Sequence, residues 1–198
     1  MTIMVSCTLD GDSVILLGIS GKQFSGKSTL ANALSNWFSQ RGYNPCKMAL
    51  ADPLKDMVKR GLGRADREAW QVFGTEVVRN GCLQYFGNSD FWVKLYLSMV
   101  QDAVAGGKYN VILCDDIRFP DELRGLRQKG FRVIRLDATE LTRRERGQST
   151  GKAYLPGHAS ELALDNTPLQ EYDLVVQSDV YSPTQLTEKV TNLLSLVA

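Results

Sequence analysis

The chain lacks a long hydrophobic run and holds few cysteines. Its longest unbroken apolar run, reached at residues 14–17, has four residues, whereas a membrane-spanning helix needs about 20. The four cysteines are widely separated and form neither a C-x-x-C pair nor a zinc-ligand spacing. No Lys or Arg precedes Lys22, so the charged start of a signal peptide is absent too. These absences argue against a protein that is stabilised by disulfide bonds or spans a membrane, and we expect a cytoplasmic protein.

The chain also lacks an excess of charge of one sign. Its 23 Lys and Arg residues balance 22 Asp and Glu residues, which gives a net charge of +1. This balance argues against a globally basic nucleic-acid binder, so we expect neither a nucleic acid nor a membrane as a partner. Hydrophobic residues make up 43% of the 198 positions, enough for a sizeable core. The length is about 1.3 times that of a typical domain, so we expect one domain over residues 1–198.

Short apolar runs alternate with amphipathic segments along the chain. Such alternation predicts an α/β fold in which helices cover both faces of a parallel sheet. Two insertions interrupt it, a helical stretch within residues 52–106 and a polar, arginine-rich stretch at 138–157. The first twelve residues are weakly patterned, as in a loose end or a short added strand. We expect five parallel strands, at residues 14–20, 47–51, 111–114, 131–136 and 174–176.

A phosphate-binding motif follows the first of these strands. Residues 21–28 read G-K-Q-F-S-G-K-S and match G-x-x-x-x-G-K-[ST], a pattern expected by chance about 0.01 times in a chain of this composition. Glycines let backbone N–H groups curl around a polyphosphate, and the helix that follows adds the positive end of its dipole. The motif predicts a three-layer P-loop NTPase fold. The expected ATP-binding residues are Gly21, Lys22, Ser25, Gly26, Lys27, Ser28 and Thr29.

Acidic residues at the end of the third strand predict a Mg²⁺ site. The hydroxyl of Ser28 is expected to bind the ion together with a carboxylate at the end of a neighbouring strand. Asp115 and Asp116 both follow the run at 111–114, and we favour Asp115 as the nearer to the strand. The other carboxylate then serves as a cap for the next helix.

The remaining features favour a small kinase. The N-K-x-D motif by which GTPases recognise their base is absent. A kinase must exclude water and bring cations to the transferring phosphoryl group. Residues 138–157 suit such a lid, because Arg143, Arg144 and Arg146 lie within four positions; which of them acts is left open. Alternatively, the protein binds an NTP without any transfer.

Five short motifs together resemble the deoxynucleoside monophosphate kinases of tailed bacteriophages. Animal-type phosphomevalonate kinases share part of the pattern, so an enzyme of that type is the alternative. The resemblance spans roughly residues 14–177 and implies phosphoryl transfer from ATP to a (deoxy)nucleoside monophosphate, with Mg²⁺, in the host cytoplasm. The motifs are S-G-K at 20–22, A-D-P-L-K at 51–55, Q-x-x-G-T-E-x-x-R at 71–79, D-D-I-R-F-P-x-E-L at 115–123 and H-x-S-E-x-x-L-D at 158–165.

The resemblance also implies roles for individual residues. Arg79 and Arg118 clamp the acceptor phosphate, and Arg118 together with Lys27 and the lid arginines forms the catalytic set. The resemblance places the remaining acceptor residues near the base or the sugar: Asp52, Lys55, Gly74, Thr75 and Glu76. From the residues alone, Asp52 is as readily a helix cap, and the pair at 75–76 is as readily helix surface.

Several prominent residues are left without a chemical role. Transfer to an ionised phosphate needs no general base, so His158 receives none. We assign Trp37, Trp70 and Phe73 to the core and Glu161 to the start of a helix. The accepted bases, the preference for ribose or deoxyribose and the choice of donor stay open, as does a homodimer.

Overall fold

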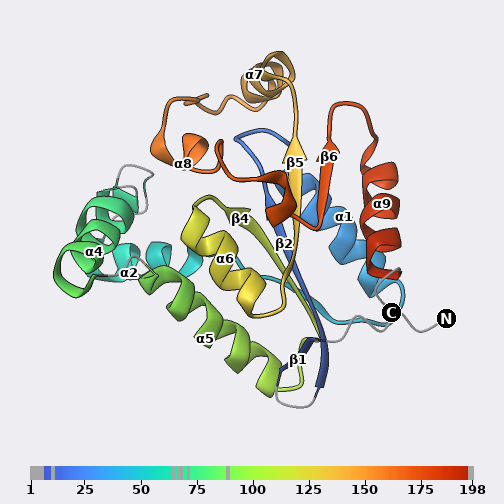
Figure 1. The fold of residues 1–198 in the computed structure, drawn as a ribbon, viewed down its shortest axis with the longest axis horizontal. Helices are drawn as coiled ribbons and strands as arrows, with labels where there is room; N and C mark the ends of the chain where they lie inside the picture. Colours follow the sequence, from blue (N-terminus) through green and yellow to red (C-terminus); the bar gives the residue numbers. More distant parts are fainter. Residues whose placement is uncertain are drawn as a thin grey trace.

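The computed structural model describes residues 7–9, 12–63, 66, 69–70, 72–87 and 90–195. Its centre is a sheet whose five parallel strands have the order β3-β4-β2-β5-β6, with β1 added antiparallel to β2. The expected parallel α/β sheet is therefore confirmed (Figure 1). The strands are β1 (Cys7–Leu9), β2 (Asp12–Ser20), β3 (Pro45–Lys47), β4 (Val111–Ile117), β5 (Arg132–Asp137) and β6 (Leu174–Gln177).

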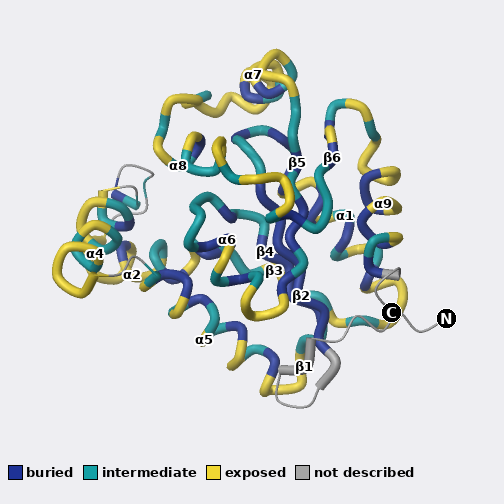
Figure 2. Tube along the Cα trace, viewed as in Figure 1, coloured by how far each residue is buried: buried dark blue, intermediate teal, exposed yellow. Residues whose placement is uncertain are grey.

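Helices cover both faces of the sheet and bury its apolar strands. On one face, α1 (Lys27–Ser39) and α9 (Pro183–Ser195) close a core that contains Leu17, Leu34 and Val190. On the other face, α5 (Phe91–Ala105) and α6 (Pro120–Gln128) close a second core around Tyr96 and Ile112. Because β2 lies between two layers of helices, its residues from position 14 onward are buried on both sides (Figure 2).

All five parallel strands differ by at least one residue from those expected, and two of the differences bear on the site. β3 ends at Lys47, so the strand predicted at residues 47–51 lies two residues earlier and the rest of that segment is a turn. The cause is Asp116, whose carboxylate accepts the backbone N–H groups of Leu50 (2.7 Å) and Ala51 (2.9 Å). β4 continues to Ile117, so both aspartates lie inside the strand and not after it.

The helical stretch expected within residues 52–106 consists of separate helices. The described parts before α5 are α2 (Asp52–Leu62), the π-helical η1 (Val72–Arg79) and α4 (Asn80–Phe86). Gly63 and Gly87 end α2 and α4 in left-handed backbone, with φ of 65° and 69°, a conformation that glycine adopts without strain. Gln71 of the predicted acceptor motif lies outside the described residues.

The arginine-rich stretch begins with a helix. α7 (Glu140–Ser149) is followed by an irregular segment and the short α8 (Ala159–Leu162), and a turn at η2 (Leu169–Glu171) precedes β6. In Figure 1, α7 and α8 lie beyond the ends of β4 and β5, and α2 with α4 lies to one side of the sheet. Among the described residues, no helix is long and apolar enough to cross a membrane.

Candidate active site

The phosphate motif forms a tight loop between β2 and α1. Gly21 and Gly26 have φ of 144° and 96°, and α1 begins at Lys27. The ammonium group of Lys27 donates hydrogen bonds to the carbonyl oxygens of Gly21 (2.7 Å) and Lys22 (2.8 Å). The loop therefore folds around its own lysine, at the end of a buried strand and the start of a helix, as phosphate binding requires.

Lys27 is buried among charges of both signs. Burial is the main cause that lowers its pKa from 10.5 to about 7, and the nearby charge of Arg118 lowers it further. Glu161, Asp115 and Asp116 act in the opposite direction. A polyphosphate bound in the loop brings negative charge that favours the protonated amine.

Replacing Gly21 by alanine is expected to destabilise the protein and abolish nucleotide binding. The added Cβ would lie 2.3 Å from the carbonyl oxygen of Leu136, in left-handed backbone. We expect a loss of about 2–4 kcal/mol in the free energy of unfolding, measured with urea. Gly42→Ala is the control, because Gly42 has φ of 81° but nothing within 4 Å of the added atom. Equal losses for the two variants would contradict a close approach at Gly21.

The other predicted donor residues surround the loop. Ser28 and Thr29 are exposed in the first turn of α1. The buried hydroxyl of Ser25 has no hydrogen-bond partner among the described residues, so a polar ligand in the loop would supply one. Lys22 points to the start of the segment after α8, where it pairs with Asp165 at 2.8 Å.

The two aspartates of β4 have different surroundings. Asp116 is engaged by the two N–H groups of the β3–α2 turn, and burial raises its pKa. Asp115 is half-buried, and its carboxylate forms no hydrogen bond or ion pair with another described residue. Its charge acts on Lys27, which adjoins Ser28. The exposed hydroxyl of Ser28 and the carboxylate of Asp115 are hard oxygen donors, the kind of ligand that Mg²⁺ takes.

A pocket of about 380 Å³ lies beside the loop. Gln23 of the loop forms part of its wall, together with Trp70, Trp92 and Phe119. Asp52 and Glu76 are not among the described residues that line it. Asp52 accepts the backbone N–H of Ala49 at 2.9 Å, and Glu76 is exposed and bonded to Asn80. The predicted acceptor residues in the wall are Lys55, Gly74, Thr75, Arg79 and Arg118.

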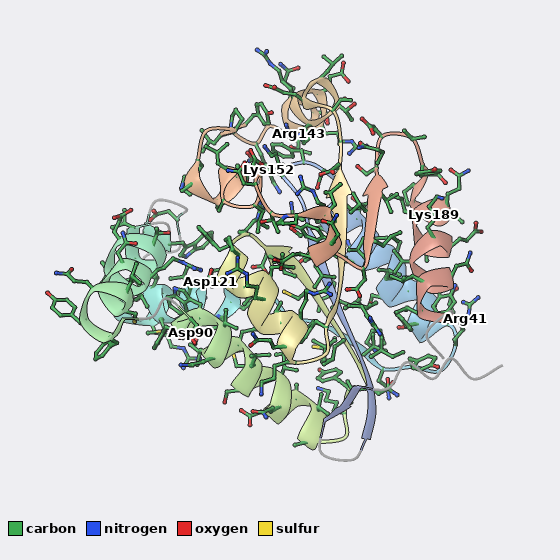
Figure 3. The ribbon with its side chains drawn as sticks, in the orientation of Figure 1. Arg41, Asp90, Asp121, Arg143, Lys152 and Lys189 are labelled. Carbon is green, nitrogen blue, oxygen red and sulfur yellow. The ribbon has the colours of Figure 1, made fainter. Side chains whose placement is uncertain are left out.

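Two of these residues also have structural roles. A Cβ at Gly74 would lie 2.6 Å from a methyl group of Leu54, so glycine lets η1 approach α2 closely. Arg79 is held by Asp121 and by Glu122 (2.6 Å), and its guanidinium lies 4.0 Å from the centre of the Phe119 ring. Figure 3 labels Asp121 at the end of α6 that lies toward α2 and α4.

Glu122 and Glu161 fix the position of Arg118. Glu122 accepts the backbone N–H of Arg118 at 2.7 Å, and burial raises the pKa of Glu122 to about 7 although Arg79 opposes this shift. Glu161 accepts a hydrogen bond from the Arg118 guanidinium at 2.6 Å. The sequence pointed to neither role; its only signal was that both glutamates belong to the motifs at 115–123 and 158–165.

The predicted lid is attached to the phosphate loop at several points. Arg146 donates to the carbonyl oxygen of Phe24 and to the hydroxyl of Ser178, each at 3.2 Å. The Phe24 ring packs on Gly147, where a Cβ would lie 2.9 Å from it. Arg143 is buried and donates to the carbonyl oxygen of Ala138, whereas Arg144 is exposed. Figure 3 shows Arg143 and, after it, Lys152 on this side of the molecule.

Two residues to which the sequence assigned no chemical role also line the pocket. Trp70 lies in the wall and not in the core to which it was assigned, and its buried indole N–H has no hydrogen-bond partner among the described residues. His158 lines the pocket and accepts the backbone N–H of Ser160 at 3.2 Å through Nδ1, which caps α8. Helical spacing alone does not distinguish a pocket wall from a core stripe, since both are apolar.

No family model and no curated protein matches the chain, whereas solved structures do. The tunicamycin resistance protein of Deinococcus radiodurans is 14% identical over 90% of this chain and 94% of its own, with a TM-score of 0.57. A gluconokinase from Sinorhizobium meliloti is 15% identical over 93% of both chains, with a TM-score of 0.53. A sugar kinase from Janibacter is 17% identical over 93% of this chain and 98% of its own, also at 0.53. The chain therefore has the three-layer α/β fold of P-loop kinases.

Proposed function

We propose that the protein is an ATP-dependent kinase that phosphorylates a (deoxy)nucleoside monophosphate to the diphosphate. The observation that carries this proposal is one continuous site. The phosphate loop and a pocket with aromatic walls share Gln23, and Arg118 lies between them. A donor polyphosphate in the loop and an acceptor in the pocket would then meet near Lys27 and Arg118.

On the donor side, the loop holds the phosphates of ATP. Backbone N–H groups of the loop, other than that of Gln23, which Glu161 accepts, surround them. Lys27 exchanges its carbonyl partners for phosphate oxygens. Ser28 and Asp115 would hold the Mg²⁺ ion, which when bound neutralises charge on the phosphate oxygens. Arg146 is the lid arginine whose side chain contacts the loop, and this contact favours it over Arg143 and Arg144 as the one that acts.

On the acceptor side, the pocket suits a flat base with a phosphate. Trp70, Trp92 and Phe119 offer aromatic surface against which a base can stack. Lys55 and Arg118 supply positive charge in the same pocket, beside Arg79, which is paired with Asp121 and Glu122. A planar guanidinium matches a phosphate dianion. The aromatic walls favour a nucleotide over phosphomevalonate, which carries no ring to stack. The cations favour a phosphorylated acceptor over NTP binding without transfer.

A panel of acceptors tests the proposal. Purified protein is incubated with Mg²⁺ and ATP, and with each nucleoside and deoxynucleoside monophosphate or phosphomevalonate in turn, and diphosphate formation is followed. We expect diphosphate from at least one nucleoside monophosphate. Turnover of phosphomevalonate alone, or ATP hydrolysis indifferent to every acceptor, would refute the proposed activity.

Replacing Trp70 by alanine is expected to weaken acceptor binding and leave donor binding unchanged. Stacking of a base on an aromatic side chain contributes about 1–3 kcal/mol, so the acceptor KM should rise about 5- to 150-fold. Steady-state kinetics with the best acceptor of the panel measures this rise. Trp37→Ala is the control, because Trp37 packs against Arg41 and against the core that α1 and α9 close. An unchanged acceptor KM in Trp70→Ala would show that the base does not stack on Trp70.

A further inference from the structure

A buried carboxylate connects the phosphate loop to the acceptor pocket. One carboxylate oxygen of Glu161 accepts the backbone N–H of Gln23 in the loop (2.5 Å). The other accepts a hydrogen bond from the guanidinium of Arg118 (2.6 Å). Its side chain is 1% exposed, whereas that of Arg118 is 25% exposed. The bridge joins two segments that are more than 90 residues apart in the chain.

The arrangement leaves part of Arg118 open to the pocket. A guanidinium carries five N–H donors, and Glu161 accepts a hydrogen bond from one of its nitrogen atoms. Glu122 holds the backbone N–H of Arg118 at 2.7 Å, so carboxylates restrain both ends of this residue. The remaining N–H groups belong to a side chain that lines the pocket.

The charge of Glu161 also suits this place. Arg118 and Lys27 are two cations close enough for one to act on the other, and Glu161 acts on Lys27 with the opposite sign. A buried anion between them offsets their repulsion. A buried carboxylate that leaves its partners pays a large desolvation cost, so Glu161 is expected to stay in place when an acceptor phosphate arrives.

We propose that Glu161 is a positioning residue that holds Arg118 against the phosphate loop, so that one guanidinium serves both the acceptor phosphate and the transferring phosphoryl group. This inference rests on the proposed kinase function. Glu161 itself touches neither substrate. It acts through Arg118, and its second bond to Gln23 makes the distance between the loop and Arg118 a fixed feature of the fold.

A double-mutant cycle between Glu161 and Arg118 tests this role. Glu161→Gln keeps the shape but removes the charge and one of the two acceptor atoms, because an amide nitrogen cannot accept a hydrogen bond. We expect kcat to fall about 10- to 100-fold. The acceptor KM should rise as well, while the affinity for a non-hydrolysable ATP analogue changes little. In an Arg118→Ala background, Glu161→Gln should lower kcat by less than about threefold, because the residue through which it acts is gone.

Asp173→Asn is the matched control. Asp173 is a carboxylate with a 10% exposed side chain and similar partners, namely Arg127, Arg132 and the backbone N–H of Val133. It lies just before β6 and is not among the residues that line the pocket. This variant should lose stability without a change in kcat. Thermal unfolding of every variant shows which ones fold, and Glu161→Asp, which keeps the charge, should recover part of kcat.

The outcomes separate the inference from the function on which it rests. A wild-type protein without transfer to any acceptor would overturn both. With an active wild type, equal losses from Glu161→Gln in the two backgrounds would overturn the positioning role alone. A lower acceptor KM in Glu161→Gln would overturn it too, because it would mean that Glu161 competes with the phosphate for Arg118.

Discussion

Lys27→Met is expected to lower kcat about 10²–10³-fold with every acceptor, the scale of a lost preorganised donor to a developing charge. Methionine fills a similar buried volume without the ammonium group. The loss should be the same for all acceptors, because Lys27 follows the loop glycines and serves the donor phosphates. Initial rates across the acceptor panel measure it.

The pH dependence of nucleotide binding tests the same residue. In the free protein, burial lowers the pKa of Lys27 to about 7, and bound phosphates raise it again. Above pH 7, binding must therefore take up a proton, so the affinity of the wild type should fall by up to about tenfold per pH unit. Titrations with a metal-free ATP analogue, from pH 7 to pH 9, report this slope.

Two variants serve as comparisons. Lys27→Met has no amine to titrate, so its affinity should lack the slope, and the ratio of wild-type to variant affinity removes the titration of the nucleotide itself. Lys189→Met changes a lysine on α9 that lies over Tyr181, away from the loop, and should behave as wild type. A wild-type affinity independent of pH above 7 would contradict a neutral Lys27 in the free protein.

The fold was predictable from the sequence because its signals are local. The buried strand before the loop, the glycines within it and the amphipathic helix after it lie within residues 14–38. Each is specified by neighbours a few positions apart. The alternation of apolar runs then fixes a parallel sheet with helices on both faces.

The misplaced features depend on contacts between distant residues. Leu50 and Ala51 belong to an apolar run that reads as a strand, but the carboxylate of Asp116 takes their N–H groups and makes a turn. A pattern of neighbouring residues cannot reveal these two hydrogen bonds, because their partners are 65 and 66 positions apart in the chain.

The same limit applies to the site. Trp70 has the spacing of a core residue, and only the arrangement of α2, η1 and α5 opens a pocket beside it. Glu161 reads as part of a short helix, and its bridge between Gln23 and Arg118 appears only in three dimensions. The motif residues could be named from sequence, whereas the carboxylates that hold them could not.

Arg118→Ala is expected to separate the two substrates of the proposed reaction. Arg118 lines the acceptor pocket, and its loss should raise the acceptor Kd about 10- to 150-fold, the cost of a charge-assisted contact to a phosphate. If the contact strengthens as the phosphoryl group moves, kcat should also fall about 10²–10³-fold. The affinity for an ATP analogue should be largely retained, because the loop and Lys27 stay intact.

Calorimetric titration of each substrate, beside steady-state kinetics, measures these effects. Arg118→Lys keeps the charge but not the planar fork, so it should recover binding more than kcat. Arg124→Ala is the matched control, since Arg124 is a 63% exposed arginine on α6 whose nearest carboxylate, on Glu171, is 3.9 Å away, and it should behave as wild type. If Arg118→Ala abolished binding of the ATP analogue and spared the acceptor, the donor and acceptor sites would have to be exchanged.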